Sequence, residues 1–506
     1  MTSLAALWTL RMSGQLSEWN HIDGGSINVF VAVCFATLLA FSNGANDIAN
    51  SVGTAVGAGA ISLRVALIIG STSELLRCVL MGGEVQKTVG KGVVSLGEYD
   101  THEDLLAIAM TAVLAGAGIS TGLATAFGLP VSATHGAISG LTAVALFERG
   151  SPAIDDSGLG WTVFGWVASP LVGAVAAGSL ATVIERRIFA APNPAAAAHR
   201  MRPLLVGGTI ALIVVFLCSK GPLWLRMPWW GAAIAAALSG TVAAFAVRNV
   251  CKIPVGVALT MFGDDAAAAP AAPAGGRAGQ APGVPPLRTV TDGPPDDAES
   301  DSWLLADGQG SEDGAVDGKE LAERQFSGLL VLTGCTVAFA HGGNDLGNST
   351  GPLLIALEHS GGSGSWMKDG ASLPIFGGLC FVAGILAVGS RTIATVGSKI
   401  TKLTHSSAFA VQAGATLAVL LSTAIGLPVS TSHCLVGALI GTGVAARYTP
   451  STDGRERAPL DLKVLRKIVV AWVVTIPLAV VLALAVYVPL RATLSHPTEG
   501  GGSAAG

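Results

Sequence analysis

Charged side chains are scarce in this sequence, and their scarcity excludes an ordinary soluble domain. Only 12% of the 506 residues are Asp, Glu, Lys or Arg, whereas soluble domains carry about 25%. Residues 161–184, 229–247, 372–390 and 468–486 contain no ionisable side chain apart from cysteine. Each stretch is close to the roughly 20 residues that cross a bilayer as a helix. Together with a mean hydropathy of +0.61, this predicts an all-α, multi-pass membrane protein.

Cysteine patterning is also absent. The seven cysteines are scattered along apolar segments, and no two of them form a Cys-x-x-Cys pair. This spacing indicates neither a disulfide framework nor a zinc site, so we interpret the cysteines as small buried hydrophobic residues. We expect no resident cofactor and no nucleic-acid partner.

The sequence does contain a long internal repeat. Residues 40–53 return as residues 338–351, with eight of fourteen aligned positions identical and an offset of 298 residues. The pattern Gly-Leu-Pro-Val-Ser-x-x-His at residues 128–135 returns at residues 426–433 with the same offset. Two motifs repeated in one register indicate a duplicated chain.

The repeat divides the chain into five predicted parts. These are an N-terminal extramembrane segment (1–26), a first membrane half (27–250), a cytoplasmic linker (251–325), a second membrane half (326–490) and a C-terminal tail (491–506). Residues 264–324 are rich in Ala, Pro and Gly and carry thirteen acidic and four basic side chains. This composition favours disorder for the linker. By length, the two halves hold about twelve membrane segments, with broken or re-entrant helices at the motifs.

Lys and Arg side chains predict how the halves are oriented. We place three basic segments in the cytoplasm: Arg186, Arg187, Arg200 and Arg202; Arg391, Lys399 and Lys402; and Lys463, Arg466 and Lys467. This choice leaves both termini outside and makes the two halves face in opposite directions. Such an inverted repeat is typical of secondary transporters with a site near the midplane of the bilayer. We expect the protein in the plasma membrane, and a homodimer is compatible with the sequence.

Asp47 and Asp345 are the aspartates that the repeat relates, and both follow glycines within apolar segments. An aspartate at that depth is costly in lipid and marks a candidate functional site. We predict a helix break at each aspartate, with the two carboxylates brought together at the midplane. Together with the amide oxygens of Asn50 and Asn348, they offer the hard oxygen ligands that small cations prefer.

The repeated Gly-Leu-Pro-Val-Ser motif predicts a binding site for an oxyanion. Pro130 should end or kink the preceding helix, and proline suits the first turn of the next one. The hydroxyl groups that follow would then lie at a helix N-terminus, whose free N–H groups suit an oxyanion. The candidate substrate-binding residues are Ser132, Thr134, Ser430, Ser432, Asn46 and Asn344.

An oxyanion beside carboxylates requires a cation. At about 4 Å and an effective dielectric constant of 20, a carboxylate and an anion repel each other by about 4 kcal/mol. One or two bound cations would cancel this repulsion and couple the two fluxes. The sequence therefore predicts cation–oxyanion symport. Glu74 and Arg77 lie three residues apart, a spacing that allows them to pair on one helix face.

The motifs at residues 41–51 and 341–345, with the Gly-Leu-Pro-Val-Ser pair, resemble those of the inorganic phosphate transporter family. The likeness covers residues 27–248 and 326–490. It implies a twelve-segment inverted-repeat fold that carries inorganic phosphate with sodium ions or protons. It also implies that transport requires Asp47, Asp345, Ser132 and Ser430, and that Glu74 takes part in phosphate handling.

One departure from the family pattern concerns the coupling. Family members carry a glutamate in the second half where this chain has Gln412, eighteen residues before Ser430. A glutamine keeps the shape and the hydrogen-bonding atoms but lacks the charge and the titratable proton. The resemblance therefore leaves the number and identity of the coupled cations open.

Several other functions fit parts of this pattern. Two intramembrane aspartates suggest a protease dyad, and Ser132 with His135, or Ser430 with His433, suggests a hydrolase. The duplication argues against both enzymes, because each needs a single asymmetric site. A passive anion channel, or a symporter for a related oxyanion such as sulfate, is the alternative within transport. For His135 and His433 we favour a capping or core role over a ligand or proton-relay role.

Overall fold

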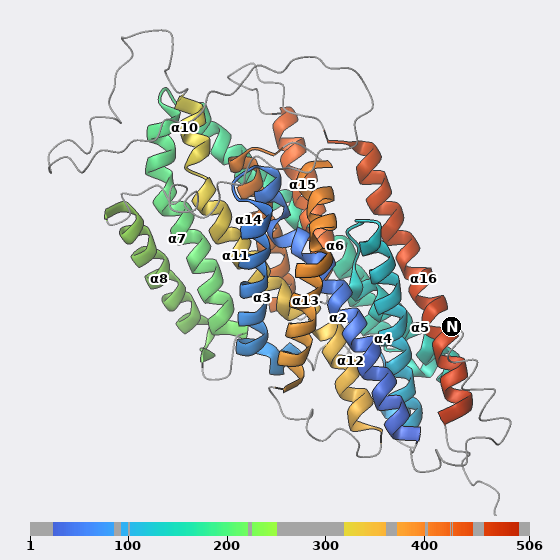
Figure 1. Ribbon diagram of the computed structural model, residues 1–506. Helices are drawn as coiled ribbons and strands as arrows, with labels where there is room; N and C mark the ends of the chain where they lie inside the picture. Colours follow the sequence, from blue (N-terminus) through green and yellow to red (C-terminus); the bar gives the residue numbers. More distant parts are fainter. Residues whose placement is uncertain are drawn as a thin grey trace, which may run out of the picture.

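Apolar helices make up almost all of the described chain (Figure 1). The structure is a computed structural model, and it describes residues 24–85, 93–99, 102–220, 225–249, 318–360, 372–399, 403–425, 427, 429–448 and 460–494. The first half contains α2 (Gly24–Gly57), α3 (Leu63–Val85), η2 (Leu96–Tyr99), α4 (Glu103–Ala126), α5 (Ala133–Arg149), η3 (Ser151–Ala153), α6 (Asp156–Ile184), η4 (Glu185–Phe189), α7 (Pro194–Lys220) and α8 (Trp229–Asn249). The second half contains α10 (Gly318–Arg324), α11 (Ser327–Asp345), α12 (Gly347–Glu358), α13 (Ser372–Ala394), η8 (Thr395–Lys399), α14 (His405–Ala424), α15 (Thr431–Tyr448) and α16 (Leu462–Leu494).

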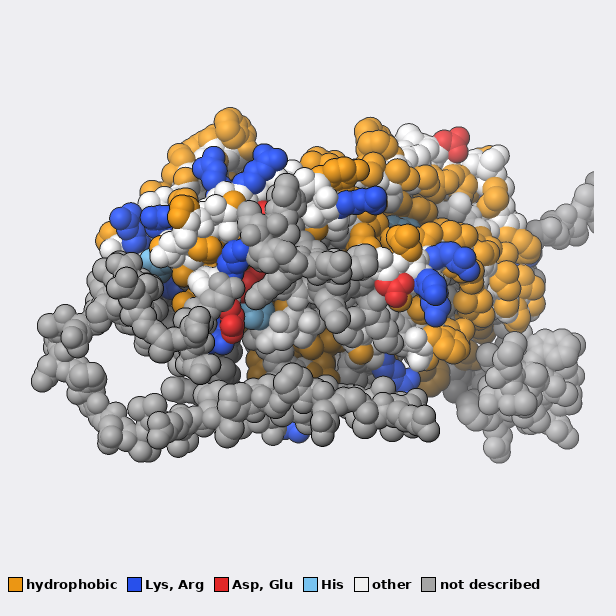
Figure 2. Space-filling view, turned by 90° about the horizontal axis from the view of Figure 1, so that it is seen from above, with side chains coloured by type: hydrophobic (Ala, Val, Ile, Leu, Met, Phe, Trp, Pro, Cys, Tyr) orange, Lys and Arg blue, Asp and Glu red, His pale blue; other side chains and the backbone are white. Residues whose placement is uncertain are grey.

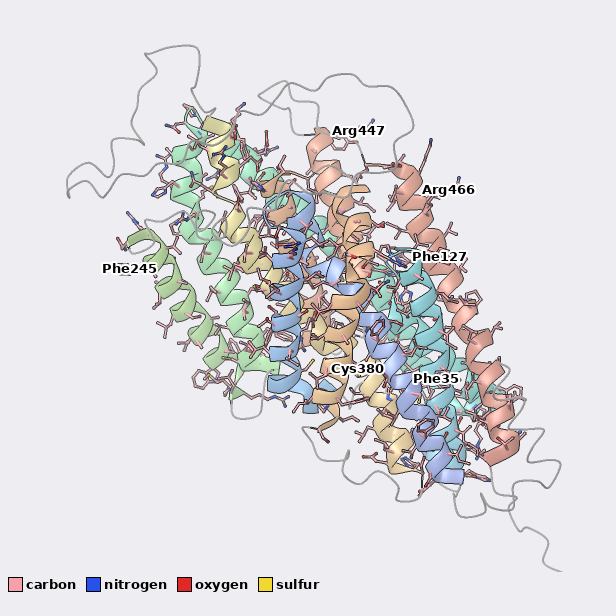
Figure 3. All side chains as sticks on the ribbon, viewed as in Figure 1. Phe35, Phe127, Phe245, Cys380, Arg447 and Arg466 are labelled. Atoms are coloured by element: carbon pink, nitrogen blue, oxygen red, sulfur yellow. The ribbon has the colours of Figure 1, made fainter. Side chains whose placement is uncertain are left out.

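The outer helices present apolar side chains to the surroundings, as a protein embedded in lipid does. Trp161 and Val175 on α6, Phe245 on α8 and Val473 on α16 are each at least 60% exposed, and Phe245 lies on the outer face of the bundle in Figure 3. Eight of the described helices are long and apolar enough to cross a membrane. The prediction of an all-α, multi-pass membrane protein is confirmed, whereas the number of twelve segments stays a prediction.

The two halves share their internal spacing. The α4 helix ends at Ala126 and α14 ends at Ala424, which are 298 residues apart. The α5 helix begins at Ala133 and α15 at Thr431, again 298 residues apart. Each half therefore builds a helix, a short turn and a second helix from the same sequence pattern.

Several helices of each half pack against helices of the other half. The α2 helix packs on α13, while its counterpart α11 packs on α3. Likewise α6 packs on α14 and α15, while its counterpart α16 packs on α4 and α5. This reciprocal exchange places the equivalent elements of both halves around a common centre.

The two halves run in opposite directions through the bundle (Figure 1). Gly24 at the start of α2 lies against Leu494 at the end of α16. At the other end of the bundle, the Gln325 side chain beside α10 donates a hydrogen bond of 3.0 Å to the carbonyl O of Ala195 on α7. The two halves therefore begin at opposite ends of the bundle, and the inverted repeat itself stays a prediction. Figure 2 views the end near α10, where Lys and Arg side chains gather above the apolar bundle.

The helix break predicted at Asp47 is wrong. The α2 helix continues to Gly57. Gly44 instead allows close packing on the backbone of Phe381 in α13, where an added Cβ would lie 2.1 Å from the carbonyl O. The second half does have an interruption, at Leu346 between α11 and α12. There the carbonyl O of Asp345 accepts a 3.1 Å hydrogen bond from the Asn43 amide, and the Ser349 N–H donates to Leu346 instead.

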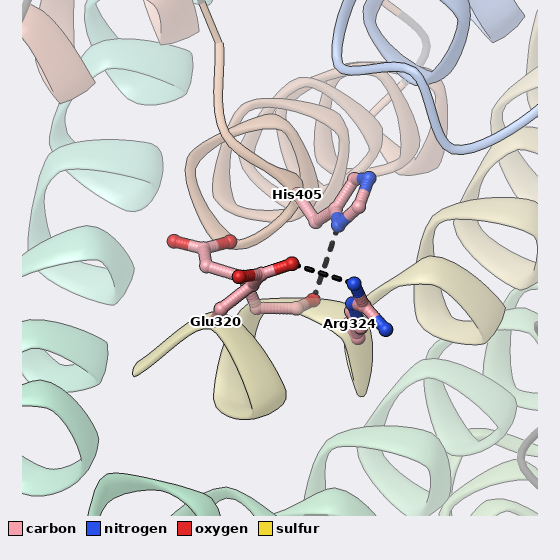
Figure 4. A network of polar contacts seen from close by, with 4 residues as sticks. Glu320, Arg324 and His405 are labelled. Carbon is pink, nitrogen blue, oxygen red and sulfur yellow. Dashed lines mark hydrogen bonds and ion pairs between the residues drawn. The ribbon is translucent and has the colours of Figure 1, made fainter. Parts of the chain in front are cut away.

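The last residues of the predicted linker are helical. The α10 helix begins at Gly318, before the predicted boundary at residue 325, and Figure 4 shows it docked beside the start of α14. The Glu323 carboxylate accepts hydrogen bonds of 2.8 Å from the backbone N–H and from the hydroxyl of Ser406. His405 Nδ1 lies 3.2 Å from the carbonyl O of Glu323. Residues 251–317 lie outside the described part of the chain.

These contacts set the limits of a linker replacement. Exchange of residues 266–317 for a short Gly/Ser linker should leave the affinity and maximal rate of phosphate uptake near their wild-type values, because the acidic, Pro/Gly-rich segment cannot bury enough apolar surface to fold. Extending the replacement through Arg324 should lower the melting temperature, because it removes the Glu323 carboxylate that accepts two hydrogen bonds from Ser406 in the first turn of α14. Phosphate uptake by reconstituted protein checks the first expectation, and thermal unfolding checks the second. Loss of uptake in a correctly inserted 266–317 variant would identify the segment as a folded domain.

Candidate functional site

Two short turns point toward the centre of the bundle, one from each half. In the first, Gly128 has φ of +66°, a conformation that favours glycine, and Ser132 caps α5 by accepting a 3.2 Å hydrogen bond from the N–H of His135. In the second, Ser430 Oγ accepts a 3.3 Å hydrogen bond from the N–H of His433. The predicted helix starts are therefore confirmed, although Pro130 precedes the cap rather than lying in the first turn.

The two turns touch each other. Ser432 Oγ donates a 3.1 Å hydrogen bond to the carbonyl O of Val131, so the second turn rests on the first. Ser132, Thr134, Ser430 and Ser432 are all buried, none more than 5% exposed. Four of the predicted oxyanion-binding hydroxyl groups therefore gather at the junction of the halves, although Ser132 and Ser430 already cap their own helices.

Asp47 and Asp345 meet at the same junction. Each is only 3% exposed, and Asn50 and Thr431 link the two carboxyl groups. Asn50 Nδ2 donates to Asp47 Oδ1 at 2.9 Å and to Thr431 Oγ1 at 3.4 Å, and Thr431 Oγ1 donates to Asp345 Oδ2 at 3.3 Å. Glu74 on α3 is fully buried and close enough to act electrostatically on both. Because like charges close together in a buried site repel each other, a bound proton or cation would lower the energy of this arrangement.

Asn50 and Asn348, related by the repeat, each reach into the opposite half. Asn50 Nδ2 donates hydrogen bonds of 2.9 Å to Asp47 Oδ1 and 2.8 Å to Ser432 Oγ. Asn348 Nδ2 donates a 3.0 Å bond to Thr134 Oγ1, and residues 134 and 432 are themselves repeat-related. The Oδ1 atoms of both asparagines are buried and have no hydrogen-bond partner among the described residues. Two unpaired amide oxygens are thus buried at the junction of the halves, and Asn50 lies directly against Asp47.

Asn46 holds its own turn instead of facing the centre. Its Nδ2 donates 2.9 Å bonds to Thr125 Oγ1 and to the carbonyl O of Leu129, and its Oδ1 accepts a 3.0 Å bond from the N–H of Val131. With its amide fully engaged, Asn46 positions the turn, so direct substrate binding by this side chain would require breaking these bonds. The side chain of Asn344 lies outside the described part of the structure.

The pair that the spacing allows between Glu74 and Arg77 does not form a hydrogen bond. Arg77 Nη1 instead donates to the carbonyl oxygens of Phe339 and Ala340 at the end of α11. Both carboxylate oxygens of Glu74 are buried without a hydrogen-bond partner in the described chain. The side chains are three residues apart on α3, but the Arg77 guanidinium is directed toward the backbone of α11.

Gln412 bridges three helices. Its Nε2 donates a 3.0 Å hydrogen bond to the carbonyl O of Ser51 on α2, and its Oε1 accepts from the hydroxyl of Thr333 on α11. The side chain is fully buried. A glutamate at this position could still accept from Thr333 but would turn a second oxygen toward the Ser51 carbonyl, which requires a proton or a cation between them.

Exchange of Gln412 for glutamate should therefore change the cation dependence of uptake. We expect Gln412→Glu to shift the half-saturating sodium concentration or the pH optimum of uptake more than it changes the maximal rate. The measurement is phosphate uptake against sodium concentration at several pH values, with wild type and variant side by side. Superimposable curves would show that position 412 only packs the three helices.

A stack of four rings lies where the turns meet, and sequence reasoning missed two of its members. His135 and His433 lie edge to face at 4.4 Å between ring centroids, flanked by Trp166 at 3.9 Å and Trp472 at 3.7 Å. Trp472 Nε1 also donates a 3.0 Å bond to the carbonyl O of Pro130. Both ring nitrogens of His135 lack a hydrogen-bond partner in the described chain. The ring therefore does not activate a serine as a hydrolase would require.

Buried carboxylates and hydroxyls at the junction of two oppositely directed, membrane-embedded halves define a membrane transport protein rather than an enzyme. Residues 43–483 match the phosphate transporter family, and the chain belongs to this family.

Similar proteins align with almost the whole chain. A putative phosphate permease of Haemophilus influenzae is 29% identical, over 92% of this chain and 97% of its own length. The chloroplastic inorganic phosphate transporter 2-1 of Arabidopsis thaliana is 30% identical, over 90% of this chain and 70% of its own length. A solved structure described as the sodium-dependent phosphate transporter superposes with a TM-score of 0.71 at 26% identity, covering 92% of this chain and all of that one.

Proposed function

We propose that the protein is a symporter that moves inorganic phosphate across the membrane together with sodium ions or protons. The observation that carries the proposal is the hydrogen-bonded chain that runs from Asp47 through Asn50 and Thr431 to Asp345, together with the unpaired amide oxygens of Asn50 and Asn348. These oxygens suit small cations, and membership of the phosphate transporter family supplies the anion.

The neighbouring hydroxyl groups supply the anion side of the proposed site. Thr134 and Ser432 are held by the same asparagine amides that lie beside the aspartates. A phosphate oxygen at these hydroxyl groups would approach the carboxylates, and the cations would offset the repulsion. Phosphate and cation would therefore bind together and cross together.

The sidedness of transport follows from the basic end of the bundle (Figure 2). Arg186 and Arg187 lie within the π-helical turn η4, and Arg391 lies in the last turn of α13. Figure 3 places Arg447 and Arg466 at the same end. Because Lys and Arg near membrane segments mark the cytoplasmic side, we propose that this end faces the cytoplasm, with the plasma membrane as its location.

Reconstituted protein tests the proposal. Radiolabelled phosphate uptake into proteoliposomes is measured with a sodium gradient alone, a pH gradient alone, and neither. Symport predicts uphill accumulation with one of the two gradients and none without. Equilibration of phosphate that ignores both gradients would indicate a passive channel, and accumulation of sulfate in preference to phosphate would assign a different oxyanion.

A further inference from the structure

Arg77 is a cationic side chain buried between the membrane helices. It lies on α3 and is only 2% exposed. Its Nη1 donates to the carbonyl O of Phe339 and, at 2.6 Å, to that of Ala340. The guanidinium also lies 5.6 Å from the ring centroid of Phe339 and 5.8 Å from that of Phe216. Backbone carbonyls and aromatic faces fix the charge in one place.

The surroundings of Arg77 carry an excess of negative charge. Glu74 lies one turn away, and Arg77 interacts electrostatically with Glu74 and Asp345. Asp345 in turn is linked to Asp47 through Thr431 and Asn50. Among the described residues, Arg77 therefore lies at the edge of a cluster of three buried carboxyl groups, and only the remaining negative charge is left for mobile cations to neutralise.

The equivalent crossing in the other half has no such cation among the described residues. Phe41 is the repeat equivalent of Phe339, 298 residues earlier. The carbonyl O of Phe41 is approached by Gly384 of α13, where an added Cβ would lie only 1.9 Å from that oxygen. At the α2–α13 crossing, a glycine lets the two backbones pack directly against each other. At the equivalent α3–α11 crossing, an arginine side chain lies between the helices and donates to the carbonyl. The two halves differ at the position that sets the local charge.

We propose that Arg77 is a tethered counter-cation for the carboxylate cluster of Asp47, Asp345 and Glu74, so that this transporter takes up one coupling cation fewer per phosphate than the cluster would otherwise require. An arginine stays protonated throughout the cycle, and it occupies carbonyl oxygens of the kind that ligate alkali cations. Its charge is part of the protein and never crosses the membrane. The inference rests on the cation-coupled transport proposed above.

The test is the number of charges moved per phosphate. Proteoliposome currents and radiolabelled phosphate flux are measured together for wild type, Arg77→Gln, Arg77→Lys, and the double variant Arg77→Gln/Glu74→Gln. We expect Arg77→Gln to move one more positive charge per phosphate and to show a steeper cation dependence. Arg77→Lys and the double variant should keep the wild-type ratio, whatever their rates, because each preserves the net charge of the cluster.

Arg491→Gln is the matched control. This arginine pairs with Glu148 at 3.0 Å at the far end of α16, away from the carboxylate cluster, so the charge-to-phosphate ratio should not change. For a variant that folds without transporting, the dependence of the melting temperature on cation concentration counts the bound cations. The number of bound cations should increase by one in Arg77→Gln and in none of the other variants.

Three results would overturn the inference. An unchanged ratio in Arg77→Gln, with wild-type uptake driven by a cation gradient, would assign Arg77 a packing role and leave the symport intact. A raised Michaelis constant for phosphate at an unchanged ratio would instead make Arg77 an anion ligand. Wild-type uptake that ignores every cation gradient would contradict both the symport and the tethered cation.

Discussion

Exchange of Asp47 or Asp345 for asparagine is expected to abolish cation-driven phosphate uptake. Asparagine keeps the size of the side chain but removes the charge that attracts the cation. A unit charge at about 4 Å contributes about 4 kcal/mol at an effective dielectric constant of 20, which corresponds to about a thousandfold in cation affinity. Neither aspartate can replace the other, because each approaches the shared position from its own half.

The measurement is initial uptake in proteoliposomes containing equal amounts of folded protein. Asp156→Asn serves as the control. Asp156 lies exposed in the first turn of α6, so this substitution removes the same charge at a position away from the junction. We expect wild-type uptake from the control and background uptake from both site variants. Normal coupled uptake by Asp47→Asn and Asp345→Asn would remove the aspartates from the cation site.

Exchange of Gly384 for alanine is expected to disrupt folding. The added Cβ would lie 1.9 Å from the carbonyl O of Phe41, closer than nonbonded atoms approach, and the neighbour is backbone that cannot rotate away. The α2 and α13 helices would have to separate, and overpacking of this kind costs about 1–3 kcal/mol or more. Because α2 carries Asp47, the separation should also disturb the site.

Thermal unfolding and size-exclusion profiles in detergent check this expectation. Gly208→Ala on α7 is the control, because an added Cβ there meets nothing within 4 Å. Alanine suits a helix better than glycine by about 0.5–1 kcal/mol, so the control should melt at the same or a higher temperature. A Gly384→Ala protein as stable as wild type would show that the α2–α13 crossing is looser than the structure describes.

The repeat made the centre of the site predictable. One offset of 298 residues relates Asp47 to Asp345 and Ser132 to Ser430, and it foretold which helix starts would face each other. Trp166 and Trp472 do not match this offset, because they are 306 residues apart, and the repeat therefore did not reveal them as a pair. The helices that carry them, α6 and α16, begin 306 residues apart as well, because the second half contains extra residues before α16.

Other features depend on contacts between distant segments, which a linear pattern does not contain. Gly44 in a polar motif suggested an unwound helix, but its missing side chain serves close packing on α13. Arg77 had Glu74 as its nearest partner in sequence, yet it binds carbonyl groups of α11. The acidic composition around α10 indicated disorder, whereas Glu323 finds the N-terminus of α14 in the folded protein.

The most direct test of joint binding at the aspartates is phosphate binding to purified protein, measured by calorimetry in sodium and in choline buffers at two pH values. Coupling predicts that the cation raises the affinity for phosphate, and that phosphate raises the affinity for the cation by the same factor. Asp345→Asn should lose this mutual enhancement. Phosphate binding that is equally tight with and without the cation at both pH values, or that keeps its full cation dependence in Asp345→Asn, would contradict a shared site for phosphate and cation.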